Sequence, residues 1–261
     1  MRPRIILARF LSRLGRFISS LALMVMRPDD LVEFSRQTYA GSDQVKYWTS
    51  PETLNRGLMP MEKALLEKLN LTRGKVLVLG LGGGREAIPL AKMGFAVTGV
   101  DFIPELARLA EENAAKQGVL IEARVGELTQ LTLPPAAYDL VWLSDRMYSC
   151  IPTRTRRIAM LKKMHQALRP GGWFACMFYW YPTPSFSPAV EWLRKAFAYL
   201  SLGNLSYEPG DVLHGEIEFI HRFGNESDLD AEFTDGGFEV IHPYLIKPEE
   251  HRGLALLRKA G

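Results

Sequence analysis

The sequence predicts an α/β protein built on a doubly wound, mostly parallel sheet, and three patterns support this prediction. First, Lys75–Leu79 is a short, continuous apolar run, which is typical of a strand buried on both faces. Second, glycines follow it at once and lead through a helix-like stretch to another apolar run, Phe95–Val100. Third, Phe238–Ile246 and Gly253–Arg258 indicate an antiparallel pair that closes the sheet.

Further apolar periods predict the remaining elements in chain order. The predicted helices are Arg85–Met93, Phe102–Lys116, Ile158–Leu168, Ala189–Leu202 and Asn225–Phe233. The predicted strands are Leu120–Arg124, Trp173–Trp180 and, with a looser alternation, Val212–Phe223.

The turn after the first strand has the composition of a nucleotide site. Glycines at 80, 82, 83 and 84 let the backbone approach a ligand closely. Asp101 ends the second strand 21 residues after Gly80, and an acid at that place can accept hydrogen bonds from ribose hydroxyls. The stretch Gly82–Ala87 also fits the G-x-G-x-x-A pattern of dinucleotide sites, so this turn alone leaves two cofactors open.

Four blocks, taken in order, resemble the class I S-adenosylmethionine-dependent methyltransferases. Val76–Ala91 is similar to the first motif of that family, and Val125–Leu128 falls where the family's third strand contacts adenine. Tyr138–Ser144 resembles its fourth strand, and Leu168–Gly172 its turn into the fifth. The resemblance spans about residues 60–180 and resumes around 220–261, and it implies a seven-stranded Rossmann-like sheet.

The resemblance also implies S-adenosylmethionine as cofactor and methyl transfer to an O, N or S nucleophile of a small molecule. The residues that it assigns to the cofactor are Gly80, Leu81, Gly82, Gly84, Asp101, Phe102, Glu127, Leu128 and Ser144. One position departs from the family pattern: Val78 stands where an acid usually helps to hold the methionine end of the cofactor. Another group is therefore expected to take over that contact.

The chain is expected to divide into five segments. These are a basic amphipathic helix (1–28), an N-terminal lid (29–60), the cofactor-binding core (61–180), a substrate cap (181–222) and a C-terminal helix and hairpin that complete the core (223–261). Pro182, Pro184 and Pro188 indicate a linker at the start of the cap.

The first 27 residues carry six arginines and no acid, and without those arginines the formal net charge changes from +3 to −3. Apolar side chains from Leu7 to Val25 share one side of the expected helix, and Arg9, Arg13 and Arg16 share the other. Three interpretations stay open: the helix packs on the protein itself as a lid, forms a dimer contact, or lies on an anionic membrane through residues 5–26. No apolar run is long enough for a membrane span.

Candidate residues for the acceptor come from the loops and the cap. Asp145 follows the fourth strand at the edge where open sheets bind ligands, so it is the candidate proton acceptor or substrate orienter. Candidate substrate-binding residues are Tyr39, Tyr148, Tyr179, His214 and His221. Each of these also has an ordinary structural interpretation, as a core aromatic ring or a solvated histidine.

Composition narrows the functional classes. Two cysteines, Cys150 and Cys176, without any C-x-x-C pair, argue against a disulfide framework or a structural zinc site and fit a reducing cytosol. The slightly acidic body and the run Ser144–Tyr148 argue against a nucleic-acid substrate. The rival functions are a membrane-associated lipid or quinone methyltransferase, a non-catalytic cofactor-binding protein and an aminopropyltransferase, with a nicotinamide oxidoreductase disfavoured. The predicted location is cytoplasmic, or peripheral at the inner face of the membrane.

Overall fold

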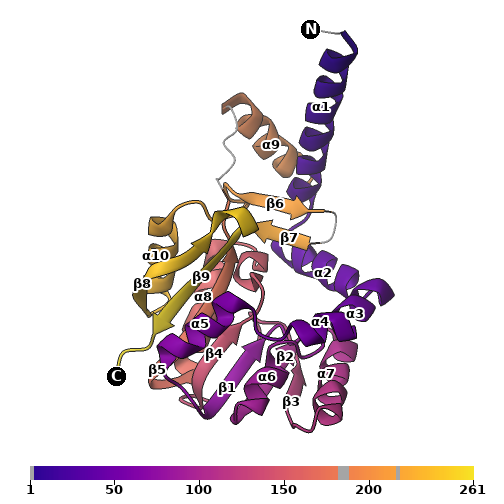
Figure 1. The fold of residues 1–261 in the computed structure, drawn as a ribbon. Helices are drawn as coiled ribbons and strands as arrows, with labels where there is room; N and C mark the ends of the chain where they lie inside the picture. Colours follow the sequence, from indigo (N-terminus) through magenta and orange to yellow (C-terminus); the bar gives the residue numbers. More distant parts are fainter. Residues whose placement is uncertain (1–2, 182–187, 216–217) are drawn as a thin grey trace.

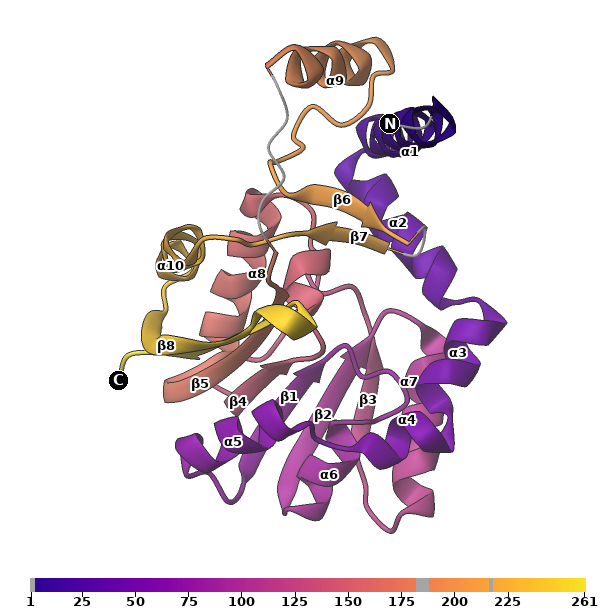
Figure 2. The same ribbon diagram turned by 45° about the horizontal axis from the view of Figure 1, so that its top comes forward.

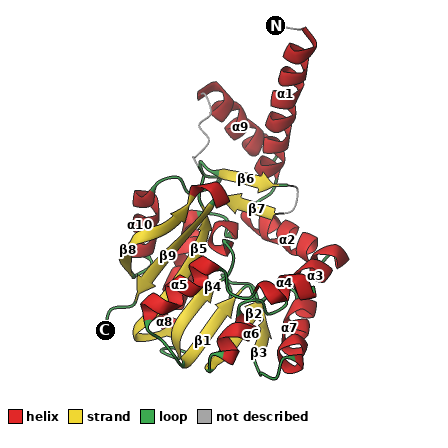
Figure 3. Cartoon of the chain, viewed as in Figure 1, coloured by secondary structure: helices red, strands yellow, loops and turns green. Residues whose placement is uncertain are grey.

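A seven-stranded sheet forms the centre of the protein, in a computed structural model that describes residues 3–181, 188–215 and 218–261. The strand order is β3-β2-β1-β4-β5-β9-β8, with β3 to β5 parallel and β9 antiparallel to both of its neighbours (Figures 1 and 3). The strands are β1 (Gly74–Leu79), β2 (Phe95–Asp101), β3 (Glu122–Val125), β4 (Tyr138–Leu143), β5 (Leu168–Tyr179), β8 (Glu239–Lys247) and β9 (Arg252–Arg258). This is the doubly wound, mostly parallel sheet that the sequence predicts.

Alternate residues of β1 face opposite layers of helices, as the pleat of a strand requires. Val76 and Val78 pack in one apolar cluster with Leu65 and Leu90, whereas Leu77 and Leu79 belong to the cluster on the other face. The first cluster involves α5 (Pro60–Leu69), α6 (Ala87–Lys92) and α7 (Pro104–Lys116), and the second α8 (Arg154–Ala167) and α10 (Glu226–Asp235). Both faces of the sheet are therefore buried.

The register of the parallel strands brings their carboxyl ends to one edge. Leu79 of β1 pairs with Val100 of β2 and with Leu143 of β4, so the turns after the three strands lie side by side. Short helices lie over this edge: α2 (Pro28–Tyr39), α3 (Ser42–Thr49), α4 (Pro51–Arg56) and the 3-10 turn η1 (Met147–Cys150). Any ligand bound at this edge is therefore enclosed by N-terminal segments as well as by the sheet.

Two elements extend away from the sheet. Helix α1 (Pro3–Val25) projects outward beside α9 (Pro188–Leu200), and the hairpin of β6 (Asp211–His214) and β7 (Glu218–His221) lies beneath them (Figures 1 and 2). We call α9, β6 and β7 the cap. In the part of the chain that the structure describes, no helix is long and apolar enough to cross a membrane.

Several sequence-based elements differ from the structure, among them α8, which begins at Arg154 and not at Ile158. The loose strand over Val212–Phe223 is a two-stranded hairpin, because Val212 and Ile220 pair with each other. The helix expected from Arg85 begins only at Ala87, since Arg85 and Glu86 turn toward the ligand edge. The fifth strand begins at Leu168 and not Trp173, because Leu168 already pairs with Tyr138. Pro182 and Pro184 of the expected linker lie outside the described residues.

Candidate functional site

A cavity of about 240 Å³ opens where β1, β2 and β4 end, and it extends under α2, α3 and β7. Eight residues that the resemblance assigns to the cofactor line it: Gly80, Leu81, Gly82, Asp101, Phe102, Glu127, Leu128 and Ser144. Gly84 does not line the cavity; it is buried beside Ile88, and its φ of +99° shapes the turn.

The glycine turn is closed on its outer side by the N-terminal helices. Gly82 adopts a φ of +53°, which favours glycine. A Cβ on Gly83 would collide with the backbone carbonyl of Trp48 at the end of α3. The glycines of this turn therefore allow two backbone segments to pack closely and also leave room for a ligand.

Asp101 has the geometry of a ribose acceptor. Its Oδ2 accepts a hydrogen bond from the Gly82 N–H at 2.8 Å, and its Oδ1 accepts one from the Ile103 N–H at 2.9 Å. Burial raises the pKa of Asp101, while these backbone donors oppose the rise. Each carboxylate oxygen keeps a free lone pair, so the group can accept from two vicinal hydroxyls without losing its backbone partners. The residues present therefore fit an adenosine ribose.

The turn after β3 supplies the next wall of the cavity. Glu127 accepts hydrogen bonds from the Thr129 backbone N–H at 3.0 Å and from the Thr129 hydroxyl at 2.6 Å, so its carboxylate is fixed by its own turn. Leu128 is buried beside it, and half-buried Phe102 lines the same cavity. A flat apolar ring fits between such side chains.

A buried charge group that sequence reasoning missed follows the glycine turn. Arg85 donates two hydrogen bonds of 3.0 Å to the carboxylate of Glu62 on α5 and one of 2.9 Å to the Gly57 carbonyl. Its second acidic contact is Glu86, and Arg85 and Glu86 both line the cavity. The only sequence signal for this group was the adjacent pair of charges inside an otherwise apolar motif.

Asp145 lies at the cavity where the sequence analysis placed the proton acceptor, but two cations neutralise it. Its Oδ1 lies 3.0 Å from Arg252 Nη1 and 3.2 Å from Arg146 Nε. Asp145 and Arg146 both adopt positive φ, at 25° and 65°, a strained conformation for residues with side chains. Such strain concentrates at functional sites, and here it turns both side chains along the cavity wall.

A second polar group faces the cavity from the cap, around Glu218 of β7. Its carboxylate accepts hydrogen bonds from Tyr39 Oη at 2.8 Å, from Tyr179 Oη at 3.3 Å and from Cys150 Sγ at 3.3 Å. Burial and the nearby carboxylate raise the pKa of both tyrosines and of the thiol, so all three stay protonated donors at neutral pH. Arg146 stacks on the Tyr179 ring, with Cζ 4.3 Å from its centroid.

Glu218 was missed by sequence reasoning, although Tyr39 and Tyr179 were proposed for the substrate. The loose alternation of residues 212–223 was the only sequence signal for it, and that signal is weak. In the structure, Glu218 begins the short buried strand β7 (Glu218–His221). Only the folded chain brings this strand against α2, β5 and η1.

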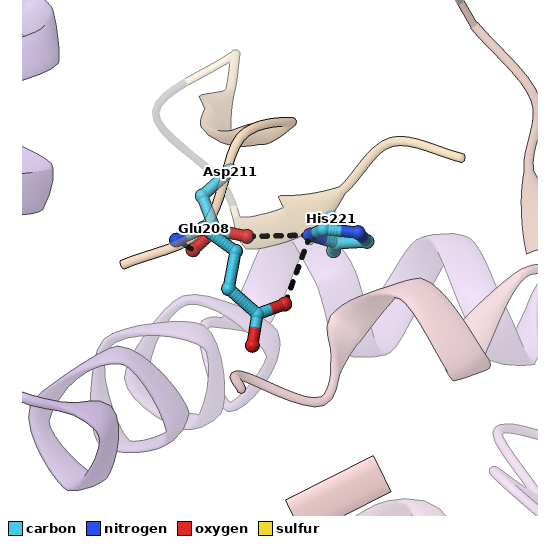
Figure 4. A group of neighbouring side chains, drawn as sticks. All are labelled: Glu208, Asp211 and His221. Atoms are coloured by element: carbon cyan, nitrogen blue, oxygen red, sulfur yellow. Dashed lines mark hydrogen bonds and ion pairs between the residues drawn. The ribbon is translucent and has the colours of Figure 1, made fainter. Parts of the chain in front are cut away.

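The other proposed substrate residues lie apart from the cavity lining. Tyr148 is fully buried and donates to Glu232 Oε2 at 2.6 Å beneath the site. His214 contacts the Tyr179 ring from outside, with ring centroids 5.5 Å apart. His221 Nδ1 lies 2.7 Å from Asp211 Oδ1 and 3.6 Å from Glu208 Oε2 (Figure 4).

The Glu208–Asp211–His221 group of Figure 4 holds the cap to the core. Glu208 Oε2 also lies 2.6 Å from Arg157 Nη2 of α8, and Arg157 bonds Glu232 of α10 through Nε at 2.9 Å and Nη2 at 2.7 Å. The buried guanidinium supplies the positive charge beside these carboxylates, so their arrangement is explained as an ion-pair network.

The fold places a cavity whose lining fits a nucleotide-like ligand at the carboxyl edge of a Rossmann-like sheet, and comparison with known proteins narrows the class of protein. Residues 76–172 match the family model described as "Methyltransferase domain". The matched segment runs from β1 to the start of β5, so this part of the chain is similar to a methyltransferase domain.

Curated relatives share part of the chain. It is 38% identical over 165 residues to a protein named ubiquinone biosynthesis O-methyltransferase from Paramagnetospirillum magneticum, covering 63% of this chain and 59% of that protein. A protein of the same name from Xanthomonas euvesicatoria is 31% identical over 106 residues, covering 40% and 43%. The chain thus spans about half the length of the curated relatives it matches.

Solved structures share the fold. The 1,6-didemethyltoxoflavin-N1-methyltransferase of Burkholderia thailandensis, solved with 1,6-didemethyltoxoflavin and S-adenosylhomocysteine, has a TM-score of 0.61 and 19% identity, and the match covers 88% of each chain. A methyltransferase from Methanosarcina mazei has a TM-score of 0.57 and 20% identity, covering 78% of this chain and 99% of that one.

Proposed function

We propose that the protein transfers the methyl group of S-adenosylmethionine to an O, N or S nucleophile of a small molecule. The observation that carries this proposal is one cavity with two differently equipped ends. Gly80–Gly82 and Asp101 suit an adenosine, whereas Glu218 and its three neutral donors suit a polar group of a second molecule. The relative solved with S-adenosylhomocysteine and a small acceptor supports the same division.

The cofactor-side proposal follows the strand order. Asp101 would receive the ribose hydroxyls, and Phe102, Glu127 and Leu128 would flank the adenine. Gly80–Gly82 leave room for the chain between the ribose and the sulfur. The sulfonium supplies an activated methyl group, so the protein mainly has to hold two reactants in line.

A nucleophile that carries a proton needs an acceptor for it, and Glu218 is better placed than Asp145. Asp145 already forms ion pairs with two arginines. Among the contacts described here, Glu218 is bonded by neutral donors. As the acceptor oxygen bonds to the methyl carbon, the carbon–sulfur bond breaks with its electrons left on sulfur, and the hydroxyl proton passes to Glu218.

The cofactor claim is tested by isothermal titration calorimetry of the purified protein with S-adenosylmethionine, S-adenosylhomocysteine and NAD(H). We expect both sulfur compounds to bind and NAD(H) not to. Asp101→Ala should weaken binding of S-adenosylhomocysteine by ~1–3 kcal/mol, since hydrogen bonds to a charged group are lost. Asp228→Ala, which removes an exposed acid of α10, is the matched control. Normal affinity in Asp101→Ala would exclude Asp101 as the ribose acid.

A second candidate, a methyltransferase that works on a lipid or quinone at a membrane surface, is favoured by the apolar side of α1. Phe10 is 60% exposed and Leu14 is 40% exposed, whereas Leu23 and Met24 at the end of the helix are buried against the cap. The adjacent α9 lies in the same outer region (Figure 2), and its Trp192 is 68% exposed. The curated relatives are named for the synthesis of a quinone.

Arginines without any acid along α1 favour an anionic lipid surface as the occupant of this apolar side. We expect the protein to co-sediment with vesicles of phosphatidylcholine and phosphatidylglycerol more than with phosphatidylcholine alone. The double variant Phe10→Ser/Leu14→Ser should abolish this binding, whereas Leu120→Ser, at an exposed leucine of the core, should not. A concentration-dependent dimer that the same double variant disrupts would instead assign the surface to a second copy.

A further inference from the structure

The buried charges around the glycine turn do not balance. Arg85 is 5% exposed and Glu62 is 1% exposed, and the two hydrogen bonds between them form a complete pair. Glu86, 3% exposed, adds a second carboxylate to the same guanidinium. One buried cation thus faces two buried acids at the wall of the cavity, an arrangement that a further cation would stabilise.

Position identifies the part of the ligand that would meet Glu86. The strand order places β2 and β4 on opposite sides of β1, so Asp101 after β2 and Asp145 after β4 mark two ends of one cavity. Asp145 is close enough to Glu86 to raise its pKa. A ligand whose ribose rests on Asp101 and which crosses the end of β1 therefore directs its other end toward Glu86.

We propose that Glu86 receives the α-ammonium group of the methionine part of the cofactor, with Arg85 and Glu62 fixing its position. This inference rests on the proposed function and names the group that replaces the missing acid. Val78, where the family acid would stand, packs in the apolar cluster of α5 and α6 and offers no polar atom. In this proposal the acid comes from Glu86, immediately before α6, and not from β1.

The alternative is that Glu86 only helps to hold Arg85. Arg85 does not require it for that purpose, because Glu62 and the Gly57 carbonyl already bind both of its terminal nitrogens. Burial raises the pKa of Glu86 to about 7, with Glu62 and Asp145 adding to the rise and Arg85 opposing it. The ionised form of Glu86 is thus disfavoured, and holding Arg85 in place does not require such a carboxylate.

The test compares two ligands that differ in the methionine part. S-Adenosylhomocysteine carries the amino-acid group, and 5′-methylthioadenosine lacks it. By calorimetry at pH 7.5, Glu86→Gln should raise the Kd of S-adenosylhomocysteine by about 10–100-fold and leave the Kd of 5′-methylthioadenosine within about twofold. Glu67→Gln, an exposed acid on α5, should change neither.

An equal loss for both ligands, or no loss for either, would overturn the proposal. If the wild-type protein binds neither ligand, the proposed function itself fails, which is a different result from a selective failure of Glu86. Normal binding of 5′-methylthioadenosine by Glu86→Gln also shows that the variant is folded.

A measurement on the wild-type protein alone decides the case if Glu86→Gln does not fold. An ammonium group on Glu86 requires the ionised carboxylate, so S-adenosylhomocysteine should release a proton on binding and its Kd should fall about 5–10-fold from pH 6 to pH 7.5. 5′-Methylthioadenosine should show no such dependence. Calorimetry in two buffers of different ionisation enthalpy counts the protons, and equal proton release by both ligands contradicts the proposal.

Discussion

At the scale of single residues, carboxylates at the cavity differ in what surrounds them, and this difference separates their roles. Asp101 accepts hydrogen bonds from backbone N–H groups, Asp145 forms ion pairs with arginines, and Glu218 accepts hydrogen bonds from two phenols and a thiol. Glu86 shares one guanidinium with Glu62. Glu218 thus differs from the other three in accepting hydrogen bonds from neutral side chains that line the same cavity.

Glu218→Gln should lower kcat by about 10²–10⁴-fold with phenol as a probe acceptor, because the proton of the phenol hydroxyl then lacks a positioned base. The loss should be largest near neutral pH and shrink as the pH approaches ~10, where a phenol ionises without help. The rate of S-adenosylhomocysteine formation against pH measures this effect.

Thiophenol is the internal control for that experiment, because it ionises far more readily and needs no base. Glu191→Gln, at an acid of α9 outside the cavity lining, is the matched control variant. A loss that is the same at every pH, or the same for both probes, would assign Glu218 to a structural role, and a larger pH-dependent loss in Asp145→Asn would return the base to Asp145.

At the scale of elements, the glycine turn and α3 are fitted to each other. The Trp48 carbonyl occupies the space that a side chain at Gly83 would need, and Asn113 of α7 donates to the Gly83 carbonyl at 3.1 Å. Helix α3, which belongs to the segment proposed as a lid, is therefore positioned over the glycine turn by backbone contact, and this contact depends on the absence of a side chain at residue 83.

Gly83→Ala should displace α3 and weaken binding of S-adenosylhomocysteine by about tenfold or more, because its new Cβ meets backbone and not a flexible side chain. Calorimetry measures the affinity, and limited proteolysis within residues 42–56 reports the displaced lid. Gly15→Ala, at a helical glycine with open space around it, should leave both unchanged. Unaltered affinity in Gly83→Ala would mean that the lid does not control the site.

At the scale of the whole molecule, one buried arginine joins the cap to the last helix. Arg157 is 1% exposed and pairs with Glu232, which is buried, and with Glu208 at the entrance to the cap hairpin. Tyr148 donates to the same Glu232 carboxylate. The position of β7, and so of Glu218, depends on this network.

Arg157→Met should lower the free energy of unfolding by about 3–5 kcal/mol at pH 7, since it leaves Glu232 buried without its cation. Urea denaturation followed by circular dichroism measures the change. The double variant Arg157→Met/Glu232→Gln should recover a large part of it, because the uncompensated charge is then removed. A double variant as unstable as the single one would show that packing, and not charge, sets the contribution.

The sequence predicted the sheet and the cofactor end because both depend on short-range pattern. The apolar run, the glycine turn and Asp101 lie within 27 residues, and any Rossmann-like chain must place them at the carboxyl edge of adjacent strands. Eight of the nine residues proposed for the cofactor line the cavity for this reason. The absence of an acid at position 78 could also be recognised from the sequence, because that position is fixed within the motif.

Only the tertiary structure decided which side chains contact the residues of the predicted site. Glu62 reaches Arg85 from another helix, Arg252 reaches Asp145 from the last strand, and Glu218 reaches Tyr39 across 179 residues. These contacts depend on how helices and the cap pack on the sheet, and nothing in the local periodicity specifies that packing. The same packing fixed Tyr148 and His221 in buried ion-pair and hydrogen-bond networks, although their residue types had suggested substrate contacts. Local pattern therefore determined where the predicted nucleotide site lies in the fold, and long-range packing determined the charges that line the cavity there.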